Sequence, residues 1–175
     1  MRRLYLPLIL FLLLALEGVA LDLLPISLLN NESIIISHWV FVFLLYIAIF
    51  FDSEQTYYSI IYGAVFGLLI DIVYTDVLGV YMFSYVIGVY MVFILKKLLH
   101  TNLIVTILLG IIGISIADIL IYIVYSFIGI TYLPMKSYLI YRLVPTVLAN
   151  LIFLIIIYPF TKKRLIRWRK DQLIS

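Results

Sequence analysis

Apolar residues fill this chain in long runs, and short polar segments separate them. A helix that spans a bilayer needs about 20 mostly apolar residues, at a rise of about 1.5 Å each. The runs predict six such helices, at 4–24, 34–51, 57–74, 80–95, 103–128 and 138–160. None of the connecting segments is long enough for a soluble domain. We therefore expect a single membrane domain over 1–160, followed by a basic tail over 161–175.

The composition agrees with an all-α integral membrane protein. Hydrophobic residues make up 66% of the chain and charged residues 12%, against about 25% charged residues in soluble domains. The mean hydropathy is +1.25. Cysteine is absent, which excludes disulfides and thiolate metal sites, and no histidine metal motif or glycine-rich phosphate loop occurs. We expect no cofactor, no metal and no nucleic-acid partner.

The positive residues predict the orientation, because cytoplasmic loops carry an excess of lysine and arginine. With the N-terminus inside, ten of the twelve cations lie on the inner side, and only Lys136 and Arg142 do not. Both ends are then cytoplasmic. One alternative concerns the first run: Arg2, Arg3 and the small residues 18–20 are also typical of a cleaved secretory signal, although Glu17 and the length of the run argue against cleavage.

The tail is expected to contact anionic lipid headgroups. Basic residues close to a membrane surface are attracted by about 1 kcal/mol each. The residues expected to do so are Lys162, Lys163, Arg164, Arg167, Arg169 and Lys170.

Charged residues inside the predicted spans are costly and need partners. Glu17, Asp71, Asp118 and Arg142 all fall in the outer half of the bundle in the predicted orientation. We expect them to form a buried polar cluster. Arg142 would be the shared counter-ion, with Asp71 or Asp118 as its nearest partner and Glu17 as a further candidate.

Small residues mark expected helix contacts. Ser59, Gly63, Gly67 and Asp71 recur every four residues and so share one face of a helix. Spacing of this kind allows two helices to approach closely in lipid. The fifth predicted span has Gly113 and Ala117 at the same spacing.

Three classes of function can be weighed from these residues. An intramembrane protease or a lipid phosphotransferase would need motifs that the chain lacks, so we expect no enzymatic activity and no catalytic residue. A substrate-binding module of a transporter and a scaffold that binds other membrane proteins both remain open.

Residues 62–85, Y-G-A-V-F-G-L-L-I-D-I-V-Y-T-D-V-L-G-V-Y-M-F-S-Y, resemble the signature region of the MreD family of rod shape-determining membrane proteins. Gly67, Asp71, Gly79 and Phe83 fall on the positions of the family pattern. The segments 96–102 and 142–150 also resemble the family, so the likeness covers essentially the whole chain.

This resemblance implies a multi-pass protein of the bacterial inner membrane, acting as a non-enzymatic scaffold in cell shape and lateral peptidoglycan synthesis. The partners it implies are MreC, and also MreB, RodA and a class B penicillin-binding protein. The family fold is similar to the substrate-binding subunits of energy-coupling-factor transporters. A substrate-binding subunit of a vitamin-type transporter therefore remains the alternative.

Overall fold

The computed structural model describes residues 5–23, 34–53 and 55–174, and these residues are helical apart from short connections. The helices are α1 (Tyr5–Leu23), α2 (Trp39–Tyr46) with its π-helical continuation η3 (Ile47–Phe51), α3 (Tyr58–Tyr74), α4 (Val80–Leu98), α5 (Leu103–Phe127), and α6 (Met135–Tyr138) followed without a break by the π-helical η4 (Leu139–Leu143) and α7 (Val144–Ile174).

Three of the helical segments are long and apolar enough to cross a membrane: Val80–Leu98, Leu103–Phe127 and Met135–Asp171. The described parts of the other three are shorter apolar helices, at Tyr5–Val19, Trp39–Phe51 and Tyr58–Tyr74. Each predicted span thus contains a helix, but length and composition alone qualify only three of them as spans.

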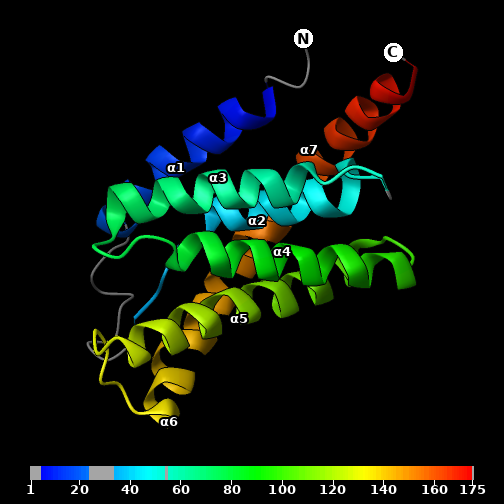
Figure 1. Cartoon of the computed structure of the whole chain (residues 1–175). Helices are drawn as coiled ribbons and strands as arrows, with labels where there is room; N and C mark the ends of the chain where they lie inside the picture. Colours follow the sequence, from blue (N-terminus) through cyan, green and yellow to red (C-terminus); the bar gives the residue numbers. More distant parts are fainter. Residues whose placement is uncertain (1–4, 24–33, 54, 175) are drawn as a thin grey trace.

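The predicted helix over 34–51 is wrong at its start. Residues 34–38 are not helical, and the helix begins at Trp39. From Val40 to Phe51 every side chain is buried, so α2 and η3 form the centre of the bundle, behind α3 and α4 in Figure 1. Hydropathy predicts neither the start of this helix nor its central position, because an apolar residue has the same hydropathy inside and outside a helix.

Side chains of α7 provide hydrogen-bond partners for the backbone of the non-helical segment 34–38. The Asn150 side chain accepts a hydrogen bond from the His38 backbone N–H at 2.7 Å and donates one to the Ile36 carbonyl at 2.8 Å. The Thr146 hydroxyl accepts from the Ile36 N–H at 3.1 Å. Buried backbone groups are costly when unpaired, so these two side chains make the break in the helix possible.

Pro145 supplies a further contact of the same kind. Proline has no N–H to donate to the carbonyl four residues earlier, which here belongs to Tyr141. That carbonyl accepts the N–H of Ile34 at 2.8 Å. The missing N–H of Pro145 thus leaves a carbonyl of the last helix that binds the segment 34–38.

The last helix continues beyond residue 160, where the predicted span ends. It continues through Pro159 to Ile174, so the basic residues of 161–170 lie on a helix. Within it Leu165 is buried, and the ring of Trp168 stacks on Tyr5 at 5.8 Å between centroids. The start of α1 and the end of α7 therefore lie on the same side of the bundle, as Figure 1 shows.

The small-residue stripe of α3 lies against α4. A Cβ atom added at Gly67 would be 2.6 Å from the Met82 Cα, whereas one added at Gly63 would be 3.8 Å from the nearest atoms, in the Tyr85 backbone. Ser59 and Asp71 extend the same buried face. The two helices therefore approach most closely at Gly67.

On α5, Gly113 and Ala117 are also buried inside the bundle. A Cβ atom at Gly113 would lie 2.9 Å from a methyl of Val92 and 3.0 Å from one of Leu45. The missing side chain leaves room for α4 and α2 to pack against α5.

Candidate functional site

A polar network surrounds the start of α2, deep in the bundle. The first N–H groups of a helix have no partner within it, and together they carry a partial positive charge. Here Glu17 of α1 accepts the N–H of Val40 at 2.9 Å through one carboxylate oxygen. A carboxylate from one helix thus caps another.

His38 precedes α2 and is completely buried. Its Nδ1 lies 3.0 Å from the hydroxyl of Tyr85 on α4, and its Nε2 lies 3.5 Å from a carboxylate oxygen of Asp118 on α5. The imidazole therefore connects the start of α2 to two neighbouring helices.

Asp118 is the centre of this network. One carboxylate oxygen accepts the hydroxyl of Tyr138 at 2.6 Å, and the other accepts Arg142 at 3.3 Å. The Tyr138 ring stacks on Tyr122 at 3.8 Å between centroids. The fully buried Asp118 carboxylate thus has a cation and a hydroxyl beside it, as a buried charge requires.

The network is suited to hold helices in place. It joins α1, α2, α4, α5 and the segment α6–η4 through contacts among their own side chains and backbone. Among the described residues, no group of three or more histidine, aspartate or glutamate side chains is arranged to hold a metal ion.

Asp71 does not join Arg142, which corrects the expected four-residue cluster. Its carboxylate accepts the backbone N–H groups of Gly79 at 2.9 Å, Tyr81 at 2.9 Å and Met82 at 3.1 Å. These are the first N–H groups of α4, so Asp71 caps that helix. Glu17 likewise bonds to a helix start, and of the candidate partners only Asp118 is bonded to Arg142.

Gly79 and Phe83 have separate roles in the resembling stretch. Gly79 has φ +95° and forms the N-cap of α4, a conformation that residues with a side chain rarely adopt. Phe83 is 51% exposed on the outer surface of α4. It takes no part in the buried network.

The six basic residues of α7 face different surroundings. Lys162 donates to the Tyr158 hydroxyl at 2.9 Å, and Lys163 and Lys170 are exposed. Arg164 and Arg167 line a pocket with Trp168, while Arg169 is only partly exposed.

A second polar cluster at the other end of α2 was missed from the sequence. Asp52 accepts the backbone N–H groups of Tyr58 at 3.1 Å and Ser59 at 2.9 Å, and so caps α3. Lys96 donates to the carbonyls of Ala48 and Asp52 at the end of η3. Burial raises the pKa of the Asp52 carboxyl, against the opposing effect of the Ser59 hydrogen bonds and the Lys96 charge.

Two sequence signals could have revealed more of the contacts around the start of α2. Thr146 and Asn150 are polar residues four apart in an otherwise apolar helix, which indicates a polar contact on one face. Pro145 beside them indicates a free carbonyl. His38 alone gave no signal, because its contacts come from residues 47 to 112 positions away.

Comparisons with known proteins agree with one another. The family model described as rod shape-determining protein MreD matches residues 1–167. The rod shape-determining protein MreD of Bacillus subtilis (strain 168) is 28% identical over 161 residues, which cover 91% of this chain and 92% of that protein. No solved structure is significantly similar to the chain.

Proposed function

This chain belongs to the MreD family of rod shape-determining proteins, and we propose that it is a non-enzymatic scaffold of the bacterial elongation machinery in the inner membrane. The family match over residues 1–167 carries the proposal. MreC is the first partner we propose, followed by MreB, RodA and a class B penicillin-binding protein, which would connect the protein to lateral peptidoglycan synthesis.

The buried network supports a scaffold because its carboxylates are bonded to groups of the chain itself. Glu17 is bonded to the α2 backbone, and Asp118 to Tyr138 and Arg142. These groups hold the helices and so shape the outer surfaces that partners would meet. The same observation favours a scaffold over a substrate-binding subunit of a transporter, since the chain's own Glu17 and Asn150 occupy the helix start where a solute would bind.

We propose that all six helical segments cross the membrane. The non-helical residues 34–38 can reach up to about 16 Å at about 3.3 Å each, and the helix Trp39–Phe51 adds about 20 Å at about 1.5 Å each. The sum exceeds a hydrocarbon thickness of about 30 Å. Non-helical backbone is tolerated at that depth because side chains of α7 satisfy its hydrogen bonds.

The proposed orientation places both ends in the cytoplasm. It is supported by the positive-inside count and by the contact of Tyr5 with Trp168, which puts the two ends of the bundle on one side. Reporter fusions at Ser137 should read as external, and fusions at Gln55 and Thr101 as internal. An internal Ser137 fusion would contradict the orientation.

Affinity capture tests the scaffold. The tagged full-length chain is purified from its native membranes in mild detergent, and co-purifying proteins are quantified against an unrelated six-span protein with the same tag. Enrichment of MreC together with wall synthases is the expected result. Enrichment of a pair of ATPases with a coupling subunit, without MreC, would replace the scaffold by the transporter alternative.

A further inference from the structure

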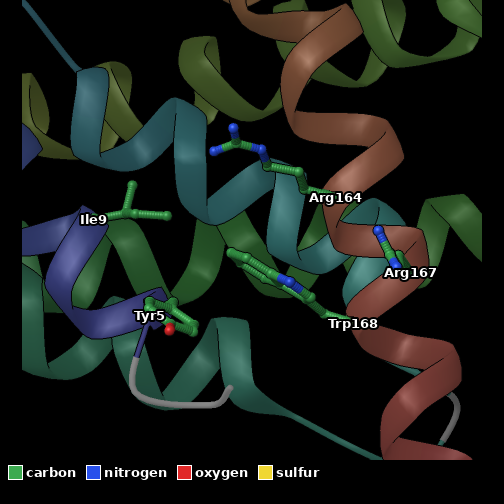
Figure 2. A pocket seen from close by; sticks show the side chains of 5 residues that line it. All are labelled: Tyr5, Ile9, Arg164, Arg167 and Trp168. Atoms are coloured by element: carbon green, nitrogen blue, oxygen red, sulfur yellow. The ribbon is translucent and has the colours of Figure 1, made fainter. Parts of the chain in front are cut away.

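Between the start of α1 and the end of α7 lies an open pocket of about 490 Å³. Its lining residues are Tyr5 and Ile9 from α1, and Arg164, Arg167 and Trp168 from α7. Figure 2 shows Trp168 and Arg164 reaching from α7 toward α1, with Tyr5 and Ile9 on the opposite wall. The pocket thus combines two arginines with two aromatic rings.

We propose that this pocket binds the phosphate headgroup of an anionic phospholipid. A guanidinium fork donates two parallel hydrogen bonds to a phosphate, and tyrosine and tryptophan are the residues that occupy the membrane interface. The proposal goes beyond a scaffold role, because it assigns a lipid to a defined place on the molecule.

The neighbouring cavity provides room for the part of an acyl chain closest to the headgroup. A second pocket of about 210 Å³ shares Ile9, Arg164 and Trp168 with the first and adds an apolar wall from Phe43, Phe160 and Leu165. A soluble phosphate would gain nothing from this wall. A phospholipid fills both parts, with its charge at the arginines and its chain along the apolar wall.

The position along α7 suits a headgroup. Arg164 follows Phe160 by four residues, which is a rise of about 6 Å along the helix. The arginines therefore follow just after the apolar end of the span predicted over 138–160, where lipid phosphates are expected. Arg164, Arg167 and Trp168 share one helix face because they are three and four residues apart.

Two other cations of α7 provide a matched control. Lys163 and Lys170 are exposed, and neither lines the pocket. A general attraction of α7 to anionic membranes would depend on them as much as on Arg164 and Arg167. Binding in the pocket depends on the arginines alone.

Quenching of Trp168 fluorescence measures which lipid occupies the pocket. The chain has two tryptophans, and Trp39→Phe removes the other while retaining a ring to stack on Phe153, which Trp39 contacts at 4.9 Å between centroids. The full-length Trp39→Phe protein is placed in phosphatidylcholine nanodiscs. Equal small fractions of either dibrominated phosphatidylglycerol or dibrominated phosphatidylcholine are added.

We expect stronger quenching by the brominated anionic lipid, with a local enrichment of about fivefold for each arginine. Arg164→Gln with Arg167→Gln should abolish the enrichment, and Lys163→Gln with Lys170→Gln should retain most of it. The leaflet does not matter, because both leaflets of the nanodisc have the same composition.

Three results would overturn the proposal. The first is equal quenching by the two lipids in the Trp39→Phe protein. This result can be obtained without preparing any other variant. The second is an equal loss in the arginine pair and the lysine pair, which would mean diffuse attraction. The third is a preference abolished by inorganic phosphate as effectively as by added anionic lipid, which would identify a site for a soluble phosphate.

Discussion

Replacing Gly67 with alanine should separate α3 from α4. The new Cβ would lie 2.6 Å from the Met82 Cα and 2.9 Å from the Tyr81 carbonyl oxygen. Carbon atoms pack at about 3.5–4.0 Å, so the helices must move apart by about 1 Å. Both obstacles are backbone atoms, which cannot rotate away, and overpacking of this kind costs about 1–3 kcal/mol.

Gly63→Ala is the matched control, one turn away on the same face. Its Cβ would be 3.8 Å from the nearest atoms, which is ordinary contact. Each variant gains about 1 kcal/mol of helix propensity, so the difference between their stabilities measures the close approach itself. Circular dichroism during heating in one detergent should show Gly67→Ala unfolding about 2–12 °C below Gly63→Ala, at about 2–4 °C per kcal/mol.

Equal unfolding temperatures for these two variants would refute the reasoning. Such a result would mean that α3 and α4 are further apart at Gly67 than the structure has them. A shape-complementation assay in cells lacking the native gene should rank the variants in the same order.

Three further predictions concern the buried network. In a double-mutant cycle, Arg142→Gln and Asp118→Asn should couple by about 1 kcal/mol or more, whereas Arg142→Gln and Asp71→Asn should be additive; coupling only in the second cycle would contradict the observed pairing. Asn150→Leu should lower the free energy of unfolding by about 2–4 kcal/mol because two buried backbone groups lose their partners, and Thr146→Val, which removes the acceptor for the Ile36 N–H and leaves the Asn150 bonds in place, should cost less in the same thermal measurement. Glu17→Gln retains an acceptor for the α2 backbone and should unfold close to the wild-type temperature, whereas Glu17→Leu should unfold lower; equal stability of the two would show that the cap contributes nothing.

The helices and their close contacts could be predicted from the sequence because both depend on local patterns. Apolar length placed a helix within every predicted span, and the four-residue spacing of Gly63 and Gly67 placed them on the face that meets α4. Gly79 was found by resemblance, and its positive φ gives the physical reason for glycine there.

The break before α2 could not be predicted in the same way. Residues 34–36 are as apolar as the helix that follows, although Ser37 and His38 are polar. The non-helical form of this segment depends on Thr146 and Asn150, more than a hundred residues later. Hydropathy records burial and carries no information on which backbone groups find partners from another helix. The conformation of residues 34–38 depends on hydrogen bonds to residues far away in the sequence. Such bonds leave no repeating pattern along the chain from which they could be predicted.

The carboxylates of the apolar helices have an explanation that counting charged side chains misses. A helix start carries about half a positive charge, so Glu17 and Asp71 find their positive partners at the first turns of α2 and α4, as Asp52 does at α3. Asp118 lies in the interior of α5, away from that helix's own start, and it is the carboxylate bonded to Arg142. Asp71 and Asp118 thus differ in role because of where they lie along their helices. Asp71 lies near the end of α3 and caps the start of the next helix. Asp118 lies within α5 and is paired with the cation of Arg142.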